Sequence, residues 1–170
     1  MHVHDAVFRF CPPCGGPLET RLLKDGDPPR LVCDACGFIF YLDPKLAVGT
    51  VIVDDRRRIA LVKRAIEPGY GKWVFPGGYV DRGEEVQRAA VREAREETGL
   101  DVRLDRLINI YSYAGRTPVV VVYAATMISG ALVCDDESIK AKFFEPEAIP
   151  WDELAFRSTH EALREFLGQA

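Results

Sequence analysis

Long apolar runs and an excess of positive charge are both absent from this sequence of 170 residues. No run reaches the roughly 18 apolar residues that a membrane-spanning helix needs, so the sequence predicts no membrane partner. The net charge is −4 at pH 7, which argues against a protein that wraps nucleic acid by charge alone. Hydrophobic residues make up 48% and charged residues 28%, which is typical of a soluble globular protein with a packed core.

Targeting signals are also missing from the two ends of the sequence. The start, MHVHDAVFRF, has no basic segment followed by an apolar stretch, so it predicts no secretory signal. His2 stands where myristoylation needs glycine, and the end, LGQA, has no cysteine to prenylate. We therefore expect a cytoplasmic protein, and we interpret His2 and His4 as part of a loose terminus.

Cysteine is scarce, with five in the chain, but four of the five form two regular pairs. The pairs are Cys11-x2-Cys14 and Cys33-x2-Cys36, and a glycine follows the second cysteine of each. Two such pairs supply four thiolates to a tetrahedral Zn²⁺, and a glycine at that position can adopt a positive φ. Because four protein ligands leave no open position, we predict a structural rather than catalytic zinc site.

Two other roles for these cysteines are less favoured. Two disulfides in a secreted protein would leave Cys134 unpaired, and no export signal is present. Thioredoxin-like redox chemistry needs a strand-to-helix context that neither pair has. Residues 1–45 hold six acids and five bases, which argues against a nucleic acid partner for this segment. Cys134 itself is interpreted as a small core or edge residue.

The apolar pattern changes after Asp43-Pro44, so we predict a zinc ribbon at 1–44 and a second domain at 45–170. In that domain, Val- and Ile-rich segments predict strands, and 3.6-residue periodicity predicts helices. The expected strands are 46–54, 59–64, 102–114, 117–127 and 139–145, and the helices are 85–98 and 159–167. We expect Ser158 and Glu161 to form a capping box at the second helix. This order predicts an α/β or α+β fold.

Three glutamates share one side of the first predicted helix. Glu93, Glu96 and Glu97 are separated by three and four residues, so their carboxylates repel one another and favour a hard divalent cation. Arg92 lies beside them, and a contact with Glu84, eight residues earlier, requires the chain to bend back. Taken alone, such a charged run is typical of a solvated helix face.

The opposite side of the same helix is expected to pack on the sheet. There, Val91, Ala94 and Thr98 form a stripe of small residues that permits close packing.

The whole segment Gly78–Leu100 fits the pattern Gly-x5-Glu-x7-Arg-Glu-U-x-Glu-Glu-x-Gly-U, where U is an aliphatic residue. The chain therefore resembles the Nudix hydrolases, with a mild departure at Ala94, where a larger aliphatic is usual. The resemblance implies an α/β/α sandwich with a mixed sheet and hydrolysis of a nucleoside diphosphate linked to another group. It also implies these roles: Mg²⁺ or Mn²⁺ held by Glu93, Glu96, Glu97 and a carbonyl of Gly77 or Gly78, with Glu84 and Arg92 positioning the loop and helix.

Residues outside this segment complete the predicted site. Members of the family often use a further glutamate as ligand or base, and Glu137 is the natural candidate, although it is equally interpretable as a solvated loop acid. Arg64 ends a predicted strand and is a candidate to bind phosphate. Four aromatic residues are candidates either for stacking on a base or for the core and rim: Tyr70, Trp73, Tyr111 and Tyr113. The resemblance also implies a homodimer.

A zinc ribbon before this domain resembles two groups of pyrophosphatases. The NADH pyrophosphatases carry an SQPWPFP-like run after the glutamate segment, and residues 101–130 contain none. The other group acts on FAD or ADP-ribose, and the run Ile149–Phe156 is similar to it. We therefore expect a nucleotide-derived small-molecule substrate of the second kind. A nucleoside triphosphate pyrophosphohydrolase and a non-catalytic ligand-sensing module are the alternatives.

Overall fold

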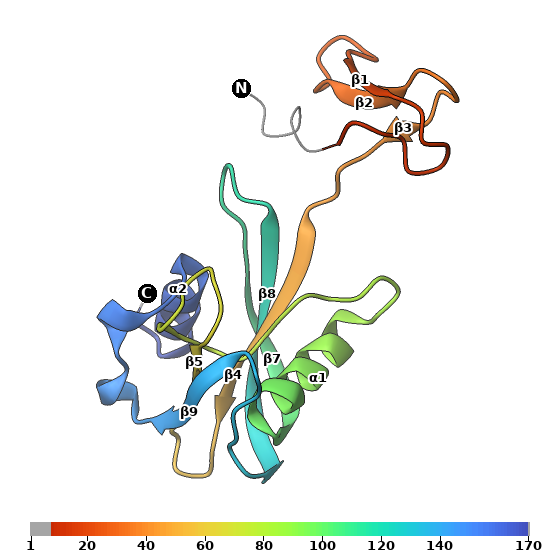
Figure 1. The fold of residues 1–170 in the computed structure, drawn as a ribbon. Helices are drawn as coiled ribbons and strands as arrows, with labels where there is room; N and C mark the ends of the chain where they lie inside the picture. Colours follow the sequence, from red (N-terminus) through yellow and green to blue (C-terminus); the bar gives the residue numbers. More distant parts are fainter. Residues whose placement is uncertain (1–7, 170) are drawn as a thin grey trace. The chain divides into compact units, whose positions relative to one another are not determined.

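The computed structural model describes residues 8–169. The chain divides into two compact units, the first ending at Asp43 and the second beginning at Pro44 (Figure 1). His2 and His4, interpreted above as a loose terminus, lie outside the described residues.

The first unit is a small antiparallel sheet. Its strands are β1 (Leu18–Arg21), β2 (Arg30–Cys33) and β3 (Ile39–Phe40), in the order β1-β2-β3. The described residues of this unit bury few apolar side chains, namely Leu31 and Val32 together with Cys11 and Cys33. A core of this size gives little stability by itself, so a small unit of this kind needs a further constraint such as a metal.

The second unit is built on a mixed six-stranded sheet in the order β6-β5-β4-β8-β7, with β9 paired to β5. The strands β4 and β8 run parallel, and the other pairs are antiparallel. The bounds are β4 Lys45–Val53, β5 Ile59–Arg64, β6 Trp73–Val74, β7 Leu100–Tyr111, β8 Pro118–Gly130 and β9 Ser138–Phe144. The short β6 is not among the predicted strands, because two residues are too few to give an alternating pattern.

Helices cover both faces of this sheet, which confirms the predicted sandwich (Figure 1). The helix α1 (Val86–Thr98) packs on the face that contains Ile52, and α2 (Arg157–Phe166) packs on the face that contains Val51. Since neighbouring residues of a strand point to opposite faces, β4 contributes to both cores. Short 3₁₀ turns at Pro146–Ala148 and Trp151–Glu153 precede α2. Of the helices in residues 8–169, none is both long and apolar enough to cross a membrane.

The packing face of α1 differs in part from the prediction. Ala90, Ala94 and Thr98 are buried, but Val91 is 36% exposed. A stripe at i, i+4 and i+8 follows one side of the helix, whereas Val91 lies about 100° further around it. The small side chains bring α1 within reach of the sheet backbone, and the Thr50 hydroxyl donates a hydrogen bond to the Ala90 carbonyl at 3.3 Å.

The start of α2 also differs from the prediction, and the capping box is wrong. The helix begins at Arg157 after Phe156, without a side-chain cap, and Ser158 is buried within the first turn. Glu161 instead accepts hydrogen bonds from the Tyr113 hydroxyl and from Arg157, both at 2.7 Å. The Glu161 carboxylate, which the local pattern predicts at the cap, therefore binds Tyr113, just after β7, instead.

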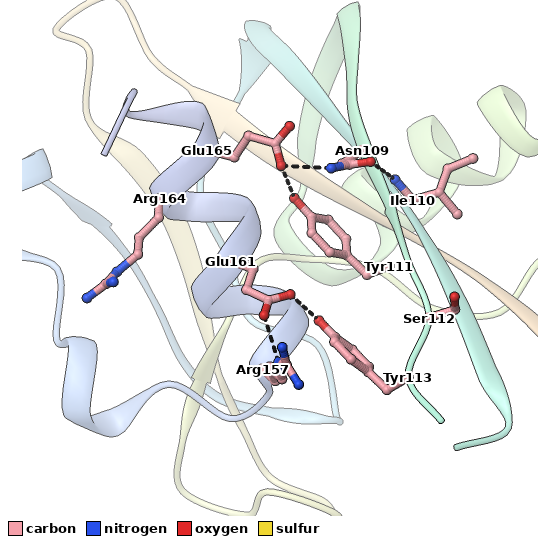
Figure 2. Close-up of a pocket in the computed structure, with 9 residues that line it drawn as sticks. All are labelled: Asn109, Ile110, Tyr111, Ser112, Tyr113, Arg157, Glu161, Arg164 and Glu165. Atoms are coloured by element: carbon pink, nitrogen blue, oxygen red, sulfur yellow. Dashed lines mark hydrogen bonds and ion pairs between the residues drawn. The ribbon is translucent and has the colours of Figure 1, made fainter. Parts of the chain in front are cut away.

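A second tyrosine–glutamate pair anchors the next turn of α2. The Tyr111 hydroxyl donates to Glu165 at 3.0 Å, and Asn109 donates to the same oxygen at 2.9 Å. Both pairs line an open pocket between α2 and the end of β7 (Figure 2). The volume of this pocket is about 510 Å³. Burial and the neighbouring carboxylates raise the pKa of Tyr111 and Tyr113, so both phenols remain donors. The pairs therefore fix α2 on the sheet.

The sheet opens between β4 and β5, and this opening positions the candidate site. The two strands pair at Val53 and Ile59, and the segment 73–78 fills the space beyond. One side of this segment pairs with β5, where Val74 lies opposite Val62. On the other side, the amides of Thr50 and Val48 donate to the carbonyls of residues 76 and 78, both at 2.9 Å. The segment thus joins the strands and leads directly toward α1.

Candidate functional site

Two glycines let the segment 73–78 pass between β4 and α1. A Cβ atom on Gly77 would lie 2.2 Å from the carbonyl oxygen of Val48. A Cβ on Gly78 would lie 2.5 Å from a carboxylate oxygen of Glu93. No larger residue fits at either position without displacing a neighbour, and the Gly78 backbone therefore lies directly against the Glu93 carboxylate.

Glu97 faces the same glycine loop. The Gly77 amide donates a hydrogen bond to the Glu97 carboxylate at 2.8 Å. Burial raises the pKa of Glu97 to about 8, although this hydrogen bond acts in the opposite direction. The Gly78 carbonyl accepts a hydrogen bond from Val48, whereas among residues 8–169 nothing donates one to the Gly77 carbonyl. Of the two predicted carbonyl ligands, Gly77 is the one whose oxygen is available.

Arg92 binds three carboxylates at once. Its Nε and Nη2 atoms donate to the two oxygens of Glu84, each at 2.9 Å. Its Nη1 atom donates to Glu93 at 2.8 Å and to Glu96 at 2.9 Å. Because α1 begins only at Val86, Glu84 lies outside the helix and the chain bends back to make this contact. Glu84 thus holds Arg92, and Arg92 holds the glutamates of the helix.

The three predicted metal ligands differ in their surroundings. The Glu93 side chain is 13% exposed and faces the glycine loop with Glu97, while the Glu96 side chain is 58% exposed. Burial raises the pKa of Glu93, and the negative charge of Glu96 adds to this effect. Within the described residues, these carboxylates do not come as close to one another as the four cysteine sulfurs do. The carboxylates of Glu93 and Glu97 and the carbonyl of Gly77 are hard oxygen donors, and such a set fits Mg²⁺ or Mn²⁺.

Arg64, the last residue of β5, belongs to the same site. Its positive charge lowers the pKa of Glu97, against the effect of burial. Its Nε donates a hydrogen bond to the Pro68 carbonyl at 2.8 Å. The acidic loop 131–137 lies beside it, since the Glu137 carbonyl accepts a hydrogen bond from the Ala65 amide at 2.7 Å. The structure therefore places the predicted Arg64 near enough to Glu97 for its charge to act there, and the Glu137 backbone beside Arg64.

Sequence reasoning missed one acidic residue of this loop. Asp135 is half-buried, and its negative charge raises the pKa of Glu97, whereas the side chain of Glu137 is exposed. The run Asp135-Asp136-Glu137 offers three acids without a spacing that would distinguish them. Cys134 in the same loop is exposed, so its interpretation as a core or edge residue is wrong.

The four aromatic candidates separate by burial. Trp73 and Tyr111 are buried, and the hydroxyl of Tyr113 binds Glu161, so these three have structural contacts. Tyr70, on the loop that follows Arg64, is exposed. It is the aromatic candidate that remains accessible for stacking.

The four paired cysteines of the first unit converge on one point. Their sulfur atoms all lie within 4.8 Å of one another, and three of the separations are 3.4, 3.5 and 3.7 Å. A tetrahedral Zn²⁺ with Zn–S bonds of about 2.3 Å places its sulfurs about 3.8 Å apart, so this donor set fits zinc. The glycines after each pair, Gly15 and Gly37, both have a φ of 73°, as predicted.

The surroundings shift the pKa of these thiols in opposite directions. Burial raises the pKa of Cys11 to about 12. Burial would raise that of Cys33 too, but the backbone amides of Cys36 and Ala35 outweigh it and lower the pKa to about 7. A bound divalent cation is what would keep all four as thiolates, so zinc binding releases protons.

The Glu84–Arg92 pair predicts an acid-dependent stability. The hydrogen bonds from Arg92 lower the pKa of Glu84 from 4.5 to about 2, so the folded state holds the ionised form more strongly than the unfolded state does. The resulting stability is present above pH 4.5 and is lost as the pH falls toward 2. We expect the gap in unfolding free energy between wild type and Glu84→Gln to shrink over that range in denaturant titrations. Glu85→Gln is the matched control, and a gap that stays constant down to pH 2 would contradict the pairing.

The cysteine cluster predicts a measurable dependence on zinc. We expect Cys33→Ser to lose nearly all bound zinc in elemental analysis and to make the first unit sensitive to protease, because its apolar core is small. Cys134→Ser should keep the zinc. A Cys33→Ser protein without zinc but with unchanged protease resistance would show that the metal has no structural role.

Comparison with known proteins agrees with this geometry. The family model described as the NUDIX domain matches residues 43–166, and the one described as Nudix N-terminal, a zinc ribbon, matches residues 9–42. A crystal structure of a NUDIX hydrolase from Nitrosomonas europaea superposes with a TM-score of 0.89 at 31% identity, covering 95% of this chain and 92% of that one.

Two curated relatives carry named activities. The ADP-ribose pyrophosphatase of Methanocaldococcus jannaschii is 38% identical over 120 residues, which are 68% of this chain and 69% of the relative. The NAD-capped RNA hydrolase of Stutzerimonas stutzeri is 28% identical over 84% of this chain, which spans about half of that protein (50%). With a zinc-ribbon unit followed by a domain that matches the family model over most of its length, this chain belongs to the Nudix hydrolases.

Proposed function

We propose that this chain is a Mg²⁺-dependent pyrophosphatase that hydrolyses the diphosphate of a nucleoside diphosphate derivative such as ADP-ribose or FAD. The products would be AMP and a phosphorylated remainder. The observation that carries the proposal is the convergence of Glu93 and Glu97 on the glycine loop, with the Gly77 carbonyl available and Arg64 close by.

The residues that would hold the cation are Glu93, Glu96, Glu97 and the Gly77 carbonyl. When bound, Mg²⁺ or Mn²⁺ neutralises charge on the diphosphate and lowers the pKa of a bound water. Zinc would belong to the four cysteines, whose soft sulfur ligands suit it as the oxygen ligands of the glutamate helix suit magnesium.

The remaining residues would orient the substrate and move one proton. Arg64 would bind the diphosphate, since its guanidinium carries donors that match phosphate oxygens. Arg92 and Glu84 would hold α1 against the glycine loop. A carboxylate in the loop 131–137 would accept the proton of the attacking water. Glu137 remains the candidate from the sequence, and Asp135 joins it because its charge acts on Glu97.

The choice of substrate rests on similarity to an ADP-ribose pyrophosphatase and on the charge of the first unit. Relatives named NAD-capped RNA hydrolases also match. Residues 1–45 hold six acids and five bases, so this segment has no excess of positive charge for RNA, and the proposal favours the small molecule.

A substrate panel tests the proposed activity directly. We expect Mg²⁺-dependent release of AMP from ADP-ribose or FAD, measured by chromatography, with less from NADH, an NAD-capped oligonucleotide and 8-oxo-dGTP. Pyrophosphate release from the triphosphate alone would favour a nucleotide-sanitising enzyme. No turnover of any compound would favour a ligand-sensing module.

A single substitution tests the metal ligands. Glu97→Gln should lower kcat by about 10²-fold or more, because it removes one charge from the cation site. The melting temperature should stay close to that of wild type, and Glu85→Gln serves as the control on the same segment. A Glu97→Gln enzyme with a near-normal rate would exclude Glu97 as a ligand.

A homodimer and a cytoplasmic location remain predictions that rest on the family and on the sequence. Light scattering of the full chain at micromolar concentration would report the mass, and the mass of a monomer would exclude the dimer.

A further inference from the structure

Arg64 is held on two sides before any substrate is present. On one side, its Nε binds the Pro68 carbonyl at 2.8 Å, and Gly69 packs so closely that a Cβ there would lie 3.5 Å from the Arg64 Cδ. On the other side, the guanidinium carbon lies 5.2 Å from the centre of the Phe156 ring. The side chain is thus enclosed between a loop and an aromatic face.

The Phe156 ring is itself fixed by the backbone around it. The preceding residue, Ala155, donates its amide to the Trp73 carbonyl at 2.8 Å, and Leu154 forms a parallel bridge with Trp73. The Phe156 carbonyl accepts the His160 amide at 3.1 Å, as the first bond of α2. The backbone before Phe156 is therefore held by the sheet at Trp73, and the Phe156 carbonyl is held by the first turn of α2.

The outer nitrogens of Arg64 have no such contacts. Among residues 8–169, no oxygen accepts a hydrogen bond from Nη1 or Nη2 of Arg64, and the guanidinium is close enough to Glu97 for its charge to act on that carboxylate. A planar guanidinium with two free nitrogens can bind two phosphate oxygens in parallel. The Nε hydrogen bond and the Phe156 ring thus fix the plane of the guanidinium and leave its two outer nitrogens free.

We propose that Phe156 is a positioning residue: its ring holds the Arg64 guanidinium in the orientation in which the outer nitrogens meet the diphosphate of the substrate. The inference rests on the proposed function. It assigns a role to a residue of the segment before α2, which lies more than fifty residues from the glutamate helix in the sequence.

The chain offers a matched control for a purely structural role. Phe166, the last residue of α2, also packs against the core and has an arginine, Arg106, 6.0 Å from its ring centre. Arg106 pairs with β8 on the edge strand β7, whereas the cation that lowers the pKa of Glu97 is Arg64. Replacing either phenylalanine with leucine removes a ring and keeps much of the apolar volume, but only one of the two supports Arg64.

Steady-state kinetics with ADP-ribose would test the role. A stacked arginine gains about a fivefold preference for its bound orientation, so Phe156→Leu should raise KM about fivefold with kcat within about twofold, because the contact binds ground and transition states alike. Phe156→Tyr, which keeps the ring face, should restore the wild-type KM, and Phe166→Leu should leave KM unchanged. An unchanged KM in Phe156→Leu, or no rescue by Phe156→Tyr, overturns the inference.

A double-mutant cycle separates positioning from general loosening of the fold. In an Arg64→Ala background, Phe156→Leu should change KM by less than about 1.5-fold, since the group it orients is gone. A full fivefold effect in that background would show that Phe156 acts without Arg64 and would overturn the inference.

Calorimetric binding of ADP in the presence of Mg²⁺ gives a readout that needs no turnover, and Phe156→Leu should weaken it about fivefold. A wild type that binds ADP but hydrolyses nothing in the panel rejects the proposed function alone. Equal ADP affinity in wild type and Phe156→Leu, or no ADP binding by wild type, rejects the inference.

Discussion

Close approach of backbone to backbone is the constraint on which the candidate site depends. The segment 73–78 reaches α1 only because β4, the segment and the helix all carry small residues where they meet. A Cβ on Gly49 of β4 would lie 2.0 Å from the Phe75 ring, and the alanines of α1 let the helix approach β4 closely enough for the Thr50 hydroxyl to donate to the Ala90 carbonyl of the helix. Larger side chains at these positions would separate the glycine loop from Glu93 and Glu97.

A single arginine offsets part of the negative charge in this tightly packed region. Three glutamates on one helical side repel one another, and Arg92 offsets this repulsion by binding Glu93 and Glu96 while Glu84 fixes its other edge. Glu97 is left outside that network, buried against the Gly77 amide with a raised pKa. The arrangement holds the carboxylates in place but leaves the most buried of them available to a cation.

Two donor sets in the chain match two different ions. The four paired thiols of the first unit lie within 4.8 Å of one another, which fits a small tetrahedral ion. The predicted oxygen donors of the second unit, three carboxylates and one carbonyl, are more widely spaced than the four sulfurs. This suits an ion that keeps some of its waters and binds phosphate. Because each set is built on local elements of its own unit, neither requires ligands from the other. On the proposed assignment, zinc would stabilise the ribbon and the second unit would carry the chemistry.

Most of the fold class and the core of the site followed from the sequence because those signals are local. The cysteine spacing, the glutamate spacing and the apolar strands depend on residues a few positions apart, so they could be recognised without the fold. The failures arose where a distant partner decided the outcome. Glu161 follows Ser158 at capping-box spacing, but Tyr113 binds it. Val91 was predicted to face the sheet, but the neighbouring Ala90 is the residue that is buried there.

The sequence alone therefore determined which side chains could bind a metal, cysteines in the first unit and glutamates in the second, and which secondary-structure elements carry them. What only the tertiary structure decided is which groups face one another: the Gly77 rather than the Gly78 carbonyl, Asp135 within the acidic loop, and Phe156 against Arg64. Spacing along a helix or strand fixes direction within that element, whereas contacts between elements depend on how the sheet opens at β4 and β5 and where the connecting segments cross it.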